Sequence, residues 1–112
     1  MRVAAVMSDL MLYSRIESAA SAAGASLVRV DSPADLPEDV ALDLVLVDWS
    51  SRQPGWAEAL AASRPGRVIL FGRHTDLEAH AEARATGLGP MWARSKLLAS
   101  LPAVMELDPQ SA

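Results

Sequence analysis

The sequence predicts an α/β domain built on five parallel strands that alternate with helices. Short, largely apolar runs recur five times along the chain, and the clearest of them, Leu44–Val47, is too short to be a buried helix. The segments between the runs carry amphipathic spacing or good helix formers, and the connections are short. Parallel strands need such helical crossovers, and right-handed crossovers build a doubly wound sheet with helices on both faces.

The composition restricts the classes of function. A chain of 112 residues suits one domain, and 51% hydrophobic against 21% charged residues favours a folded domain over disorder. The net charge of −4 argues against nucleic acid as a partner. The absence of cysteine excludes disulfides, thiol catalysis and Cys-based metal sites. No apolar run approaches the roughly 20 residues that span a bilayer, and the N-terminus lacks a signal-peptide pattern, so we expect a cytoplasmic protein with no membrane partner.

The first part of the chain is predicted to form two strands on either side of a long helix. The strands are Val3–Val6 and Leu27–Val30. Ser8 and Asp9 are both good N-cap types for the helix, and Gly24 is placed to end it. The residues between them carry apolar side chains at three- and four-residue spacing, as in an amphipathic helix.

The second helix is expected to be shortened. Two prolines in the segment after the second strand allow no more than one helical turn, around Pro33–Leu36. The third strand is Leu44–Val47, which is aliphatic throughout, as in a strand covered on both faces. Trp56–Ala62 contains good helix formers, and Val68–Phe71 is the fourth strand.

The next helix is expected to begin with a capping box at Thr75–Glu78 and to stop at Gly87. Met91–Ala93 is a short fifth strand, placed at an edge of the sheet. Ser100 is expected to cap the last helix, because Pro102 then falls in its first turn, where a missing N–H does no harm.

Five strands in a chain of this length suit the flavodoxin-like order 2-1-3-4-5. We expect residues 1–107 to form the domain and residues 108–112 to be a flexible tail. In this order the first and third strands are neighbours at the centre, so that their carboxyl ends meet.

Asp48 is the leading candidate for a functional residue. It directly follows the third strand, and open α/β sheets place their ligand sites at the carboxyl ends of central strands. The alternative is that Asp48 merely begins the following turn, because Asp is a common turn residue.

The chain resembles a response-regulator receiver domain. The resemblance rests on two motifs. Leu-Val-Leu-Val-Asp at Leu44–Asp48 matches the family's phosphoacceptor strand, and Ala85-Thr86-Gly87 matches the turn that closes the family's fourth helix. It implies a receiver-like fold and a phosphoacceptor role for Asp48. In the family, an acidic pair after the first strand helps the phosphoacceptor to hold Mg²⁺, which needs hard oxygen ligands.

The chain departs from this pattern where the chemistry is concentrated. Met7 and Ser8 stand at the positions of the acidic pair, and only Asp9, one place later, offers a carboxylate. Gly72 stands where the family has a hydroxyl that hydrogen-bonds the phosphoryl group. We therefore expect no Mg²⁺ and no other cofactor, and the chain is more similar to atypical receivers, or pseudo-receivers.

Two further motifs make the chain similar to stand-alone members of this atypical group. They are a loop with the pattern Gly72-x-His74-x-Asp76 and an Arg94-Ser95 pair after the fifth strand. Counting from Gly87 places Arg94 at the family's lysine position, whereas counting from Gly89 places Lys96 there. Several polar residues are expected on one rim of the sheet: Ser8, Asp9, Asp48, Gly72, His74, Arg94 and Ser95.

In this rim, Arg94 is predicted to pair with Asp48 in place of a metal ion. The alternative is a static ion pair that only holds the fifth strand to the third. His74 is expected at the surface or in a hydrogen bond rather than as a metal ligand, because one histidine without partners is a poor ligand set.

The leading hypothesis is a non-enzymatic pseudo-receiver that signals by protein–protein interaction, independently of phosphorylation. The resemblance places the interface on the family's fourth helix, fifth strand and fifth helix, where Met91 and Trp92 would contact a partner or a second copy. Trp56, at a helix start, is expected in the core. The alternatives are a response regulator phosphorylated on Asp48 and a flavodoxin-like domain that binds a small ligand.

Overall fold

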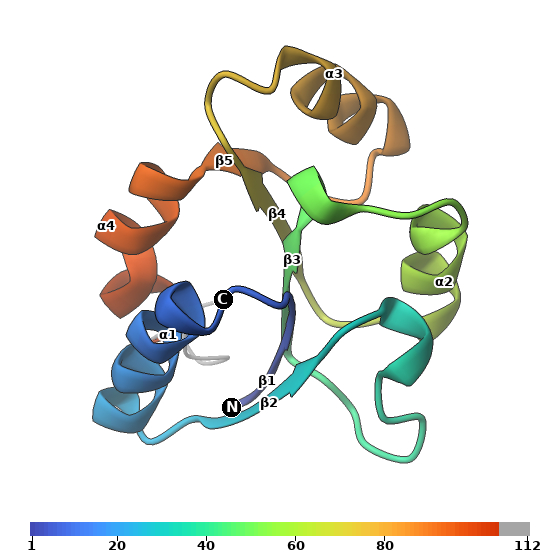
Figure 1. Ribbon diagram of the computed structural model, residues 1–112. Helices are drawn as coiled ribbons and strands as arrows, with labels where there is room; N and C mark the ends of the chain where they lie inside the picture. Colours follow the sequence, from blue (N-terminus) through green and yellow to red (C-terminus); the bar gives the residue numbers. More distant parts are fainter. Residues whose placement is uncertain (106–112) are drawn as a thin grey trace.

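The computed structural model describes residues 1–105. It contains a parallel five-stranded sheet with the strand order β2-β1-β3-β4-β5, as predicted (Figure 1). The predicted domain boundary after residue 107 and the predicted tail at 108–112 lie outside the described residues. The strands are β1 (Arg2–Val6), β2 (Ser26–Val30), β3 (Leu44–Asp48), β4 (Val68–Gly72) and β5 (Met91–Ala93).

Helices cover both faces of the sheet. Helices α1 (Leu10–Ala23) and α4 (Arg94–Met105) pack on one face, and α2 (Trp56–Ser63) and α3 (Leu77–Thr86) pack on the other (Figure 1). Two short 3₁₀ helices, η1 (Pro33–Asp35) and η2 (Trp49–Ser51), follow β2 and β3. No helix in residues 1–105 is long and apolar enough to cross a membrane.

The central strand β3 supplies side chains to both cores. Leu44 and Leu46 pack in the core beneath α1 and α4, whereas Val45 and Val47 pack in the core beneath α2 and α3. All four side chains have an exposed fraction of 0%. The prediction that this aliphatic run is a strand covered on both faces is therefore confirmed.

The second helix is reduced to the single turn η1, as predicted. Pro33 is at the start of this turn, where its missing N–H has no consequence, and the Ser32 hydroxyl accepts the Ala34 N–H at 3.3 Å. Under the resemblance to receivers, η1 stands at the place of the family's second helix, so that α2, α3 and α4 correspond to its third, fourth and fifth helices.

The predicted capping box at Thr75–Glu78 is wrong. Asp76, one residue later, is the N-cap of α3, and its carboxylate accepts the Ala79 N–H at 3.1 Å. Asp is a stronger N-cap than Thr, and this shift places Ala79 at the third helical position. The predicted end of the helix at Gly87 is confirmed, because Gly87 adopts a left-handed conformation with φ of 67°.

The predicted start of the last helix at Ser100 is also wrong. Helix α4 begins at Arg94, directly after β5, and contains Pro102 in its interior. The interior proline costs a backbone hydrogen bond, but it is on the exposed side of the helix. The buried side chains of α4 outweigh this cost by packing against the sheet: Leu97, Leu101, Val104 and Met105.

Candidate functional site

Asp48 is the last residue of β3 and is a buried carboxylate, with an exposed fraction of 2%. Its Oδ2 accepts a hydrogen bond from the Ser51 hydroxyl at 3.1 Å. Its Oδ1 is buried and has no hydrogen-bond partner within residues 1–105. A buried charge is strongly destabilising unless an opposite charge lies close to it, so that the neighbouring cation decides whether this site is stable.

That cation is Arg94, the first residue of α4. Its Nη2 lies 3.7 Å from Asp48 Oδ2, and its Nη1 lies 3.7 Å from Asp9 Oδ2. Both distances are those of ion pairs and are longer than hydrogen bonds. A single guanidinium group therefore lies between two carboxylates that come from β3 and from the start of α1.

The structure places Arg94, and not Lys96, opposite Asp48. Lys96 lies two residues further along α4, about half a turn away, and its Nζ lies 5.1 Å from the centre of the Trp92 ring, in a cation–π contact. The backbone explains the position of Arg94, because β5 pairs with the end of β4 and passes directly into α4.

Asp9 has a second role, as the N-cap of α1. Its Oδ1 accepts the N–H groups of Met11 and Leu12, both at 3.1 Å, while its Oδ2 faces Arg94. Helix capping therefore fixes the orientation of this carboxylate. Ser8 is exposed, and Met7 is buried in the core beneath α1 and α4 with an exposed fraction of 1%.

These residues do not fit a Mg²⁺ ion. Magnesium needs oxygen ligands in near-octahedral geometry, and Met7 provides only a buried thioether. In the part of the chain that the structure describes, no group of three or more His, Cys, Asp or Glu residues could hold a metal. The guanidinium of Arg94 already lies between the carboxylates of Asp9 and Asp48.

Ser50, which the sequence analysis did not single out, lies directly beside Gly72. A Cβ atom added to Gly72 would collide with the Ser50 hydroxyl and would touch the Met91 side chain. The Ser50 Oγ also accepts the Arg73 N–H at 3.2 Å. A hydroxyl from η2 thus takes the space at the end of β4 that a side chain at position 72 would need.

Three of the predicted rim residues make no hydrogen bond or ion pair with the Asp48 side chain within residues 1–105. Ser8, His74 and Ser95 are exposed, and none of them makes a side-chain hydrogen bond within residues 1–105. His74 lies in the turn between β4 and α3. The histidine that does make a contact is His80, whose Nε2 lies 3.1 Å from the Arg73 carbonyl oxygen.

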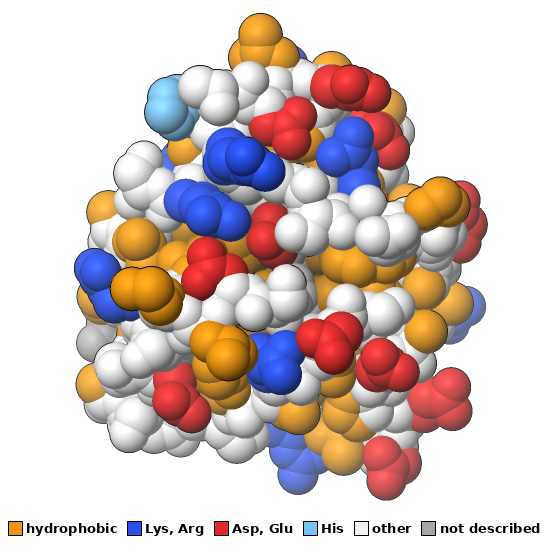
Figure 2. All heavy atoms as spheres, viewed as in Figure 1, with side chains coloured by type: hydrophobic (Ala, Val, Ile, Leu, Met, Phe, Trp, Pro, Cys, Tyr) orange, Lys and Arg blue, Asp and Glu red, His pale blue; other side chains and the backbone are white. Residues whose placement is uncertain are grey.

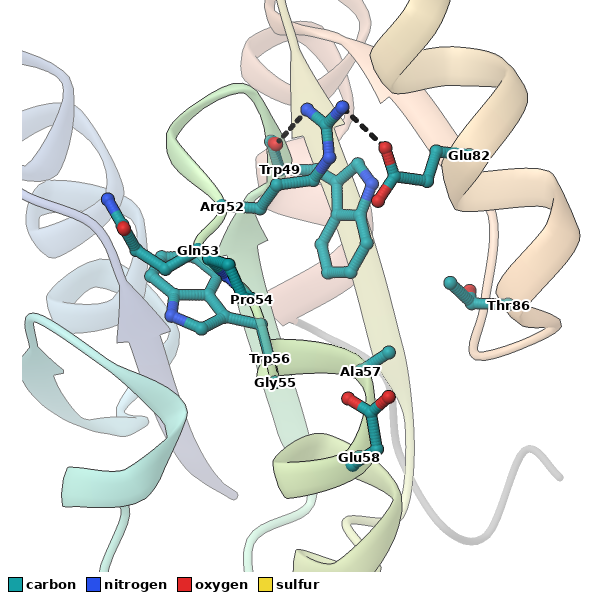
Figure 3. Close-up of a pocket in the computed structure, with 10 residues that line it drawn as sticks. All are labelled: Trp49, Arg52, Gln53, Pro54, Gly55, Trp56, Ala57, Glu58, Glu82 and Thr86. Carbon is teal, nitrogen blue, oxygen red and sulfur yellow. Dashed lines mark hydrogen bonds and ion pairs between the residues drawn. The ribbon is translucent and has the colours of Figure 1, made fainter.

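The segment after Asp48 is tied to α3 by Arg52. The Arg52 guanidinium donates to the Trp49 carbonyl at 3.1 Å and to the Glu82 carboxylate at 2.6 Å, and it lies 6.0 Å from the centre of the Trp49 ring (Figure 3). The hydrogen bond to Glu82 raises the pKa of Arg52, and the same bond lowers the pKa of Glu82 below its usual range.

Arg52 and Glu82 also line a cavity of about 520 Å³ between η2, α2 and α3 (Figure 3). Trp49 and Trp56 contribute to its apolar lining, and both side chains are buried. The expectation that Trp56 belongs to the core is confirmed. This cavity lies beside η2 and is not lined by Asp48 or Arg94.

Met91 and Trp92 are half-buried on β5, which is an edge strand. Their side chains alternate between the faces, so that Trp92 packs against the core beneath α1 and α4 and Met91 against the core beneath α2 and α3.

Figure 2 shows basic and acidic side chains interleaved in the middle of the face where the strands end. Like charges are therefore not segregated there.

No protein-family model matches the chain, and no curated protein matches it in sequence. Solved structures do match. A response regulator from Hahella chejuensis has a TM-score of 0.75 and 13% identity, with 93% of this chain and 91% of that chain covered. A putative CpaE2 pilus assembly protein from Sinorhizobium meliloti has a TM-score of 0.64 and 17% identity, with 96% of this chain and 100% of that chain covered. The chain therefore has the flavodoxin-like fold of receiver domains.

Proposed function

We propose that this chain, a domain with the receiver fold, is a cytoplasmic signalling module that acts by binding a partner protein or a second copy of itself. It catalyses no reaction, holds no Mg²⁺, and does not need phosphorylation as its switch. The observation that carries the proposal is the position of Arg94 between Asp9 and Asp48. A fixed guanidinium group there provides the positive charge that a receiver takes from a divalent ion.

The charges at the site argue against an obligatory phosphorylation step. A phosphoryl group adds a charge of about −1.5 to −2, which has to be balanced when it is placed beside other carboxylates. Arg94 supplies one positive charge, and it already faces two carboxylates. Met7 and Ser8 stand where acidic ligands would be needed, and residues 1–105 contain no group of three or more His, Cys, Asp or Glu side chains that could hold a metal ion to supply more.

We place the partner-binding surface on α3, β5 and α4. The strand β5 lies at the edge of the sheet, where one side of its backbone has no neighbouring strand within residues 1–105. Trp92 and Lys96 are stacked on this surface, and Trp is enriched in the centres of protein interfaces. Met91 precedes Trp92 on the same strand, and its side chain points to the face of the sheet that α2 and α3 cover.

The phosphorylation part of the proposal is tested with acetyl phosphate and Mg²⁺, followed by intact-mass measurement. We expect no adduct on the wild-type chain under conditions that phosphorylate a control receiver. An adduct of one phosphoryl group that is lost in Asp48→Asn would overturn this part of the proposal.

The surface is tested by photocrosslinking in cells. A photoreactive amino acid at position 92 is expected to give a discrete crosslinked species, whereas the same residue at the exposed position 61 on α2 serves as the matched control. Crosslinking at position 61 and not at position 92 would show that the surface is wrongly placed.

Phosphorylation of Asp48 is the second candidate function, and one observation favours it. Oδ1 of Asp48 has no hydrogen-bond partner within the described residues, so that this oxygen is not tied to a neighbouring group. The mass measurement above distinguishes the two candidates directly.

A further inference from the structure

The segment between β2 and β3 contains one short helical turn in place of a full helix. We call residues 31–43 the strap. The strap contains η1 and no other helix, and its Leu36 packs in the core beneath α2 and α3. Figure 1 shows it beside α2, on the side of the sheet where β2 forms the edge.

Hollows lie on both sides of the strap. One, of about 520 Å³, separates it from α2 and is lined also by Ala59 and Ala62. The other, of about 330 Å³, separates it from the beginning of β1 and β2. Pro37, Val40 and Leu42 line both hollows, and all three are only half-buried. The strap therefore presents apolar side chains that the domain itself covers incompletely.

The strap is also strongly acidic. It carries five carboxylates and no Lys or Arg. Asp31 pairs with Arg29 at 2.9 Å, and Asp43 accepts the Arg2 N–H at 2.7 Å. Asp35, Glu38 and Asp39 are exposed and form no ion pair within residues 1–105. Figure 2 shows acidic side chains gathered around hydrophobic ones at the lower right, over this part of the molecule.

The neighbouring strand β2 has a free edge. Ser26 N–H donates to Met1, and the Val30 carbonyl accepts from Met7, so that alternate residues of β2 direct their backbone groups toward β1. The backbone groups of Leu27 and Arg29 consequently point outward, where an added strand could pair with them. Val28, between them, has an exposed fraction of 39%.

We infer that the strap and the outer edge of β2 form a docking site for a basic, extended segment of a partner protein. Its backbone pairs with Leu27 and Arg29, its aliphatic side chains enter the hollows beside Val40, and its Lys or Arg side chains meet the free carboxylates of the strap. A second copy of this chain is disfavoured as the occupant, because it would bring two acidic straps together. This surface is separate from the α3–β5–α4 surface proposed above.

The test is a selection of random twelve-residue displayed peptides on the full chain. We expect the enriched peptides to combine Lys or Arg with aliphatic residues. In two-dimensional NMR spectra of the labelled chain, a synthetic copy of an enriched peptide should shift the amide signals of β2 and of the strap.

Two variants with matched changes in charge test the role of the acids. Glu38→Gln with Asp39→Asn is expected to weaken binding of the synthetic peptide at least fivefold. Glu17→Gln with Glu78→Gln removes two exposed acids on α1 and α3 and is expected to change it less than twofold. Val40→Ser tests the apolar contact and is also expected to weaken binding at least fivefold.

The inference is overturned if no peptide is enriched, if the enriched peptides lack basic residues, or if both charge variants weaken binding equally. Shifts confined to α3, β5 and α4 would also overturn it, and would instead support the surface under the proposed function. If the chain associates with itself, and if Glu38→Gln with Asp39→Asn strengthens that association, the occupant is a second copy of the chain. This result would also contradict the inference.

Discussion

Replacing Arg94 with Met should leave Asp48 as a buried carboxylate without a counter-charge. The two side chains have similar length, so that the change removes the charge and keeps much of the apolar stem. At the 3.7 Å that separates Nη2 from Asp48 Oδ2, Coulomb's law gives about 4.5 kcal/mol for an effective dielectric constant of about 20. The Arg94 side chain is 36% exposed, and water screens part of this attraction.

We therefore expect Arg94→Met to lower the free energy of unfolding by about 1–3 kcal/mol, below the full value for breaking a completely buried pair. Asp48→Asn should cost less, because the Asn side-chain oxygen still accepts the hydrogen bond from Ser51. In the double variant the unpaired charge is gone, and most of the stability lost in Arg94→Met should return.

The assay is urea denaturation followed by Trp fluorescence and circular dichroism, arranged as a double-mutant cycle. Arg84→Met, on the exposed side of α3 and without an ion pair within the described residues, is the control and should change stability by less than about 0.5 kcal/mol. The reasoning is refuted if the double variant loses as much stability as Arg94→Met and Asp48→Asn lose together, since the coupling energy would then be zero.

Three further changes test other parts of the structure. Gly72→Ser should destabilise the domain by about 1–3 kcal/mol because its side chain collides with Ser50, and Ser50→Ala should restore part of the loss; equal stability of wild type and Gly72→Ser in thermal denaturation would contradict this. The pKa of Glu82 is lowered in the folded state, so its contribution to stability is present above its ordinary value of 4.5 and is lost as the pH falls through the folded value. The free energy of unfolding of Glu82→Gln should therefore fall less than that of the wild type between pH 7 and pH 3, as measured by denaturation. The same dependence on pH in both proteins would count against the Arg52–Glu82 bond. Pro102→Ala should stabilise the domain by about 1–2 kcal/mol by restoring a hydrogen bond inside α4, and a lower midpoint in urea would argue that the helix begins later than Arg94.

The fold was predictable because its main signals are local in the sequence. An aliphatic run such as Leu44–Val47, and a glycine such as Gly24 or Gly87 after an amphipathic segment, determine where strands and helices lie. The errors occurred where two local rules competed. Pro102 favours a helix that begins just before it, but the buried face of α4 extends back to Leu97 and overrides that preference.

The site was less predictable because its contacts connect distant parts of the chain. The position of Asp48 follows from the end of β3, and the pairing with Arg94 follows from the strand order. Nothing local indicates that Arg52 bonds to Glu82, which lies 30 residues away. Ser51 is three residues from Asp48, and this spacing within a turn is a signal that the sequence analysis did not use.

The central claim is that Arg94 provides the cation of this site and that no divalent ion enters it. Its most direct test is a titration of the labelled wild-type chain with Mn²⁺, a paramagnetic substitute for Mg²⁺, observed by NMR. We predict no saturable broadening of the amide signals around Asp9 and Asp48. Broadening that saturates, is centred on those residues and disappears in Asp48→Asn would contradict the claim.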